Sequence, residues 1–193
     1  MKSKSDKIKF ISEIGINHDG SFNLAKKLIK QSKEIGCDYV KFQIRNIEEI
    51  YHPDFLKNSS NSENANQYIF NEIKRSYLEI SQYIKLFRFA KKQKIKVMVT
   101  PFDLKSLTLC KRNDIDAIKI GSPDFNNIQL IISAFKLKKP LFLSTGMSSD
   151  DEINLMKKIL NKFNIYNVPV TIFHCVSSYP PNESEINLKY IKN

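Results

Sequence analysis

The sequence contains no tryptophan, only five glycines and only three cysteines in 193 residues. The cysteines, Cys37, Cys110 and Cys175, are far apart and odd in number, so they predict neither a disulfide framework nor a metal site. Reduced thiols in a cytoplasmic protein are the simplest interpretation. No apolar run approaches the roughly 18 residues that a membrane helix needs, and the polar stretch from Met1 to Lys9 lacks the apolar core of a secretory signal. We therefore expect no membrane partner.

Acidic residues are also scarce relative to basic ones, with 20 Asp and Glu against 31 Lys and Arg, and the net charge is +11. Such a balance favours anionic partners: nucleic acid, a membrane surface or a phosphorylated small molecule. The alternative is that the lysines only cover the solvated faces of helices. The lysines are spread along the whole chain, and no common nucleic-acid motif is present. A nucleic-acid binder would rest on the net charge alone, and we expect no nucleic-acid partner.

Apolar residues alternate between strand spacing and helix spacing along the chain, and a hydrophobic content of 41% is enough for one ordinary core. Strands are predicted over residues 8–15, 39–44, 96–102, 117–122, 141–146 and 170–176. Helices are predicted over residues 21–35, 71–93 (with a break left open), 104–112, 128–137 and 149–163, with a last one from about 183. The helix at 149 begins with a capping box, Ser149 to Glu152. The alternation predicts a parallel sheet with right-handed crossovers.

Two architectures fit this alternation: an open doubly wound sheet or part of an eight-stranded barrel. No Gly-x-Gly-x-x-Gly follows the first strand, which weakens a dinucleotide-binding fold. Polar residues instead lie within or at the ends of the strands, as a barrel lumen requires: Glu13, Lys41, Gln43, Thr100, Lys119, Ser122, Ser144 and His174. A complete barrel needs about 250 residues. We therefore expect residues 1–193 to form one (β/α)8 TIM-barrel domain, truncated after about six βα units, with open sheet edges.

Two of the predicted strands carry a lysine inside an apolar run. Lys119 lies in the run from Asp116 to Pro123, and Lys41 lies in the run from Tyr39 to Ile44. Strand alternation places Lys41 and Gln43 on one face. Two buried ammonium groups would repel each other and lose protons, whereas a bound phosphate or carboxylate would remove that problem. The pattern predicts an anion site to which the hydroxyls of Thr100, Ser122 and Ser144 contribute donors.

Glu13 is the one carboxylate on the predicted strand faces. Two roles are equally compatible with its position: pairing with a lysine, or orienting a substrate hydroxyl and moving a proton. His18 lies in turn chemistry and is expected to make local hydrogen bonds, and His52 is expected to be a loop residue. His174 is a possible metal ligand, but no second ligand lies at the usual spacing.

Five motifs then identify a known family by their order along the chain. They are Glu13-Ile14-Gly15-Ile16-Asn17-His18-Asp19-Gly20, Lys41-Phe42-Gln43, Lys119-Ile120-Gly121-Ser122, Leu143-Ser144-Thr145-Gly146-Met147, and His174-Cys175 followed by Tyr179-Pro180. The sequence resembles the N-acetylneuraminate (sialic acid) synthase family, which includes the legionaminic and pseudaminic acid synthases. The resemblance covers nearly the whole chain from Lys9, and each motif lies at the end of a predicted strand.

The resemblance implies a barrel enzyme, active as a homodimer, that condenses phosphoenolpyruvate (PEP) with an N-acetylated amino sugar such as N-acetylmannosamine. In that reaction C3 of PEP attacks the sugar aldehyde, water adds at C2 and phosphate leaves by C–O cleavage. A divalent metal, usually manganese or magnesium, polarises the aldehyde. By the same resemblance, the PEP phosphate and carboxylate would be held by Lys41, Thr100, Lys119, Ser122 and Ser144. Glu13, Gln43 and Tyr179 would contact the sugar, and Glu13, Lys41 and Lys119 would be catalytic.

The sequence departs from the family pattern at three places. Pro123-Asp124 replaces the usual Gly-Glu or Gly-Asp, so Asp124 keeps a carboxylate for substrate binding while the turn changes. Ser177 stands where many members have asparagine. The metal-binding histidines and the antifreeze-like domain of the family would lie beyond Asn193.

These departures lead to one expectation and one alternative. We expect the 193-residue chain to bind PEP weakly at best and not to catalyse alone. The alternative is a truncated, non-catalytic sugar-phosphate binding or interaction module. The polar segment 45–71, which is expected to be a loop, is expected to help select the nonulosonic acid that is made.

Overall fold

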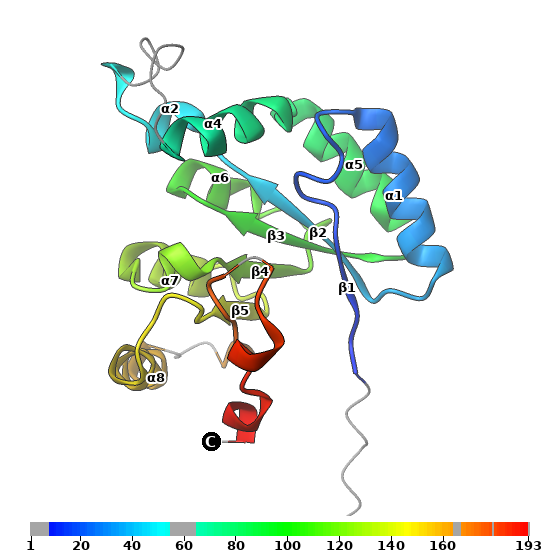
Figure 1. Ribbon diagram of the computed structural model, residues 1–193. Helices are drawn as coiled ribbons and strands as arrows, with labels where there is room; N and C mark the ends of the chain where they lie inside the picture. The colour runs from blue at the N-terminus through cyan, green and yellow to red at the C-terminus, as the bar shows by residue number, and fades with distance from the viewer. Residues whose placement is uncertain (1–7, 55–64, 164–166, 179, 193) are drawn as a thin grey trace, which may run out of the picture. The chain divides into compact units, whose positions relative to one another are not determined.

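The computed structural model describes residues 8–54, 65–163, 167–178 and 180–192 (Figure 1). Within this part of the chain, six strands follow the chain order β1-β2-β3-β4-β5-β6 in one sheet. Their bounds are Ile11–Glu13 (β1), Tyr39–Ile44 (β2), Lys96–Pro101 (β3), Ala117–Ile120 (β4), Leu141–Ser144 (β5) and Val170–Phe173 (β6). The pairs β1–β2, β4–β5 and β5–β6 are parallel. The predicted α/β class is confirmed, and closure into an eight-stranded barrel stays a prediction.

The described helices connect successive strands. They are α1 (Phe22–Glu34), α2 (Ile47–Ile50), α4 (Ala65–Arg75), α5 (Ile80–Lys92), α6 (Leu104–Leu109), α7 (Ile128–Phe135) and α8 (Asp150–Phe163). Short 3-10 turns cover Ser122–Asp124, Glu183–Glu185 and Leu188–Lys192. No described helix has both the length and the apolar content to cross a membrane. The three cysteines are free thiols.

The chain divides into two compact units, the first made of Met1–Gln43, Tyr51–Met98 and Asn113–Ile115. Within it α1 packs against α5 (Figure 1). Phe42 of β2 contacts the rings of Tyr83 and Phe87 on α5, with centroid distances of 6.1 and 5.6 Å. Phe42 therefore lies on the helix-covered face of β2, and Lys41 and Gln43 lie on the opposite face, as alternation predicts.

Local sequence explains where α1 begins and ends. The Ser21 side chain accepts a hydrogen bond from the backbone N–H of Leu24 at 3.2 Å, which satisfies a donor at the helix N-terminus. Gly36, just beyond the helix, has φ +84°, a left-handed conformation that glycine adopts without strain. The helix therefore spans almost the residues that its apolar periodicity predicts.

The second unit consists of Ile44–Ile50, Val99–Arg112 and Asp116–Asn193. In it β5 pairs with β4 and β6, so that Lys119 lies beside Phe142, and Ser144 lies beside Phe173. The rings of Phe142 and Phe173 are stacked, with their centroids 5.6 Å apart. At the start of α8, Ser149 N–H donates to the Glu152 carboxylate at 2.7 Å and Glu152 N–H donates to Ser149 Oγ at 3.3 Å. The predicted capping box is confirmed.

Several predicted boundaries are wrong, and the first strand covers only Ile11–Glu13 rather than residues 8–15. The segment 45–71 was predicted as a loop, but it contains α2 and the first part of α4. Its polar composition hides the helix, because only Phe70 in the described side chains of this stretch is fully buried. The sixth strand ends at Phe173 rather than at residue 176. The last predicted helix is a pair of short 3-10 turns in the part of the chain that is described.

Candidate functional site

In the first unit, Glu13 and Lys41 form an ion pair between neighbouring strands. The register of β1 and β2 places these residues side by side, and Lys41 Nζ lies 2.8 Å from Glu13 Oε2. The Lys41 side chain is 3% exposed, whereas that of Glu13 is 52% exposed. Of the two roles left open for Glu13, the structure shows the pairing with a lysine. Because half of the Glu13 side chain still faces solvent, a role toward a substrate hydroxyl stays a prediction.

Gln43 is held by its backbone from two sides. The N–H groups of Ile14 and Gly15 both donate to the Lys41 carbonyl, at 3.0 and 2.9 Å, so the end of β1 lies close against β2. A Cβ at Gly15 would lie only 2.7 Å from Gln43 N, which explains the glycine there. Tyr83 donates its hydroxyl proton to the Gln43 carbonyl at 3.1 Å. The Gln43 side chain, which is partly exposed, therefore projects from a fixed backbone.

His18 is fully buried in the first unit. Its Nδ1 accepts a hydrogen bond from Gly20 N–H at 3.2 Å, which confirms the predicted local role. The ring meets Tyr83 edge to face at 6.3 Å. Nε2 is buried and has no hydrogen-bond partner in the described part of the chain. Burial lowers the pKa of His18, although the nearby Asp19 carboxylate opposes this shift, so the imidazole is neutral near pH 7. The sequence did not predict this burial.

In the second unit, hydroxyl groups gather where β4 and β5 end. Ser144 is buried, and its Oγ has no hydrogen-bond partner among the described residues. Ser122 Oγ accepts a hydrogen bond from Gly146 N–H at 3.1 Å. Thr145 Oγ1 donates to the carbonyl of Phe173 at 2.8 Å, which ties this junction to β6. Buried hydroxyls are nearly always paired, so the Ser144 hydroxyl is a donor that a ligand oxygen would satisfy.

Lys119 and Thr100 belong to the same unit. Thr100 is 2% exposed near the end of β3. Lys119 is only partly buried, so the prediction of a fully buried lysine is right for Lys41 and wrong for Lys119. The physical reason is that a lysine has a long methylene stem, which can lie along an apolar surface while the residue as a whole stays partly exposed.

Asp124 is the last residue of the 3-10 turn Ser122–Asp124, and Pro123 suits the first turn of a helix because no N–H donor is needed there. Asn127 Nδ2 donates to Asp124 Oδ1 at 3.3 Å. Burial raises the pKa of Asp124, while the Asn127 hydrogen bond and the Arg45 charge oppose that shift. The guanidinium carbon of Arg45, Cζ, lies 3.7 Å from the centroid of the Phe102 ring. The carboxylate that the sequence predicts as a substrate contact is thus in a partly desolvated position.

Two further predicted residues lie after β6. Ser177 is exposed, and its hydroxyl donates to the Gly146 carbonyl. Tyr179 lies outside the described residues. His174 Nε2 is buried without a hydrogen-bond partner in the described chain. His174 lines a cavity of about 360 Å³ together with Lys157 and Tyr190.

A divalent metal does not fit the described donors. No group of three or more His, Cys, Asp or Glu side chains in the described residues is arranged to hold a metal ion. Among the residues that the structure describes, His174 therefore has no set of companion ligands such as a metal site needs.

Comparisons with known proteins agree with these features. The NeuB family matches residues 28–193. The N,N'-diacetyllegionaminic acid synthase of Campylobacter jejuni subsp. jejuni serotype O:2 is 33% identical over 95% of this chain and 55% of its own. The N-acetylneuraminate-9-phosphate synthase of Drosophila melanogaster is 32% identical over 96% of this chain and 50% of its own.

A solved structure is also similar. The N-acetylneuraminic acid (sialic acid) synthetase of Leptospira borgpetersenii serovar Hardjo-bovis, crystallised with citrate, is 31% identical with a TM-score of 0.80. That similarity covers 96% of this chain and 60% of the synthetase. The present chain spans about half the length of the curated relatives that it matches. The chain belongs to the NeuB family, and the proteins to which it is similar include sialic, legionaminic and pseudaminic acid synthases.

Proposed function

We propose that this chain carries the PEP-binding part of a nonulosonic acid synthase. The observation that carries the proposal is the cluster at the ends of β4 and β5. There, the buried Ser144 hydroxyl has no partner in the described chain, and Ser122 is fixed by Gly146 N–H. Lys119 lies on the strand next to Ser144. A lysine and convergent hydroxyl donors suit an anion such as the phosphate or carboxylate of PEP.

The proposed reaction joins C3 of PEP to the aldehyde carbon of an N-acetylated amino sugar. Water adds at C2 of PEP, the C2–O bond to phosphate breaks, and phosphate leaves. Lys119, Thr100, Ser122 and Ser144 would hold the anionic groups of PEP, with Lys41 as a second ammonium group.

The sugar would be contacted by a second set of residues. Glu13, which is half exposed, would orient a sugar hydroxyl or move a proton, and Gln43 would donate its side-chain amide. Asp124, Ser177 and Tyr179 complete the proposed substrate contacts. Since the described donors do not fit a divalent metal, no step is assigned to one.

Titration calorimetry with PEP tests the proposal, using Ser144→Ala against a matched variant. Ser148→Ala is that control, because Ser148 Oγ is also buried without a described partner but lies outside the predicted site. We expect Ser144→Ala to weaken PEP binding by about tenfold, the value of a hydrogen bond to a charged group. Ser148→Ala should change it by less than about twofold. No PEP binding by the unmodified chain, or equal loss in both variants, would refute the proposal.

Phosphate release separates binding from turnover. Incubating the chain with PEP and N-acetylmannosamine, with and without manganese, checks the prediction that the 193-residue chain does not catalyse alone. Binding without release would favour the binding-module alternative for this chain. Release would establish the synthase reaction directly.

A further inference from the structure

The loop between β1 and α1 has an unusual backbone. Within residues 14–21, hereafter the β1–α1 loop, Ile16, Asp19 and Gly20 have φ values of +63°, +48° and +70°. Left-handed conformations are unfavourable for residues with a side chain, above all for a β-branched residue such as Ile16. Such a backbone persists only where surrounding contacts hold it.

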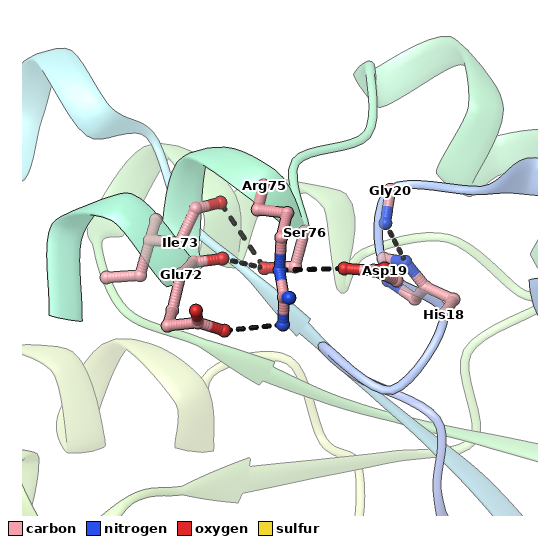
Figure 2. A network of polar contacts seen from close by, with 7 residues as sticks. All are labelled: His18, Asp19, Gly20, Glu72, Ile73, Arg75 and Ser76. Atoms are coloured by element: carbon pink, nitrogen blue, oxygen red, sulfur yellow. Dashed lines mark hydrogen bonds and ion pairs between the residues drawn. The ribbon is translucent and has the colours of Figure 1, made fainter. Parts of the chain in front are cut away.

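Those contacts come from the last turn of α4, some 50 residues further along the chain. Figure 2 shows Arg75 between two carboxylates: its Nε lies 2.8 Å from Asp19 Oδ1, and one terminal nitrogen lies 2.6 Å from Glu72 Oε2. The backbone of the same turn packs on Gly20, where a Cβ would meet the Arg75 carbonyl at 2.5 Å. Ser76 Oγ donates to the Glu72 carbonyl at 2.8 Å and keeps this turn closed.

The loop is connected in turn to the end of β1. Asn17 Nδ2 donates to the Glu13 carbonyl at 2.7 Å. Gly15 N–H donates to the Lys41 carbonyl at 2.9 Å. A change in the loop backbone would therefore move the residue whose carboxylate pairs with Lys41.

We propose that Arg75 is a positioning residue that holds the β1–α1 loop and thereby sets the orientation of Glu13 toward the sugar substrate. The sugar substrate in this proposal rests on the proposed function. The role of Arg75 in holding the loop rests on geometry alone. It gives α4 a role in sugar recognition without direct contact. In the Arg75–Asp19 pair the side chains are 61% and 53% exposed, so the pair contributes little to global stability. Its effect is expected in the loop and at Glu13.

Amide hydrogen exchange in the 193-residue chain tests whether Arg75 holds the β1–α1 loop. The reporting amides are Asp19 N–H, bonded to the Ile16 carbonyl, and Ser21 N–H, bonded to the His18 carbonyl. We expect Arg75→Gln to raise their exchange rates by about tenfold while the urea midpoint stays nearly constant. Arg88→Gln on α5 is the control, because it removes the same charge from an exposed position on a different helix of the first unit. Unchanged exchange in Arg75→Gln would overturn the proposal.

A mutant cycle tests the pairing itself. Asp19→Asn should raise the same exchange rates, and the double variant with Arg75→Gln should add little to either single variant. Fully additive effects would show that Arg75 does not act through Asp19 and would overturn the proposal.

Sugar binding tests whether Arg75 affects sugar recognition. Saturation-transfer NMR with N-acetylmannosamine in the presence of PEP should show at least about fivefold weaker sugar binding in Arg75→Gln, with the PEP affinity unchanged. Equal sugar affinity in Arg75→Gln and Arg88→Gln would overturn the role in sugar recognition. Failure of PEP to bind the unmodified chain would instead refute the proposed function, and the exchange experiment would still decide whether Arg75 holds the loop.

Discussion

Lys41 and Lys119 lie in similar apolar sequences but in different surroundings. Lys41 on β2 is 2% exposed, and a carboxylate on the neighbouring strand, Glu13, lies 2.8 Å away. Lys119 on β4 is only partly buried, and its neighbour across the sheet on β5 is the aromatic Phe142. The Ser122 hydroxyl is close to Lys119 in sequence, and the Ser144 hydroxyl is on the neighbouring strand β5.

The difference teaches that strand register, rather than the local pattern, decides the role of a lysine in a strand. In the β1–β2 register the neighbour of Lys41 is the carboxylate-bearing Glu13, whereas in the β4–β5 register the neighbour of Lys119 is Phe142. A lysine beside a carboxylate is largely neutralised, whereas a lysine near hydroxyl donors is suited to an external anion. If the proposed function holds, we therefore expect Lys119 to contribute more to PEP binding than Lys41.

The largest expected effect is on ligand affinity at Lys119. Lys119→Met should weaken PEP binding by about 30-fold, or about 2 kcal/mol, because a charge-assisted hydrogen bond to the anion is lost. Calorimetry checks this value, with Lys158→Met as a control that removes the same charge from an exposed position on α8. Equal weakening in both variants would mean that only net charge matters, which contradicts the assignment.

A smaller effect is expected on folding at Glu13. Glu13→Gln should lower the free energy of unfolding by about 1–2 kcal/mol, because the buried Lys41 ammonium loses its Glu13 partner while half of that carboxylate was already solvated. Urea unfolding followed by circular dichroism measures the change. The double variant Glu13→Gln, Lys41→Met should recover part of the loss, since an apolar side chain then replaces the buried charge. A double variant less stable than Glu13→Gln alone would contradict this account.

The smallest expected effect is a pH dependence from His18. Burial lowers its pKa in the folded chain below the value of about 6.5 in the unfolded chain, so the unfolded chain takes up the proton first as the pH falls. The stabilisation from neutral His18 is therefore present above about pH 6.5 and is lost progressively below it. Urea midpoints between about pH 7.5 and 5.5 check this prediction.

Two variants test whether His18 is the source of that pH dependence. His18→Gln should flatten it, whereas His52→Gln should keep it, because His52 is exposed. An unchanged slope in His18→Gln would rule out His18 as its source.

The sequence predicts much of this fold because the decisive signals are local. The second strand is predicted with its observed bounds, since an apolar run between Gly36 and a polar segment allows few alternatives. The start of α8 is predicted because Ser149 and Glu152 satisfy each other's backbone groups. Both cases depend on residues within a few positions of each other.

The features that the sequence does not predict depend on distant residues. The missing partner of Ser144 Oγ is a property of packing and cannot be seen in a motif. The contact of Arg75 with Asp19 joins residues that lie in different predicted elements. The helical part of segment 45–71 is hidden by its polar composition, so the prediction of a loop was wrong.

The most direct test of the central claim is an NMR titration of the isotope-labelled chain with PEP. We predict that the backbone amide shifts concentrate at Gly121 and Ser122 and at Ser144 to Gly146, where Gly146 N–H already bonds Ser122 Oγ. Lys119→Met should abolish those shifts at the same PEP concentration. Shifts that spread over the exposed lysines of α8, or no shifts at these amides at saturating PEP, would contradict the account.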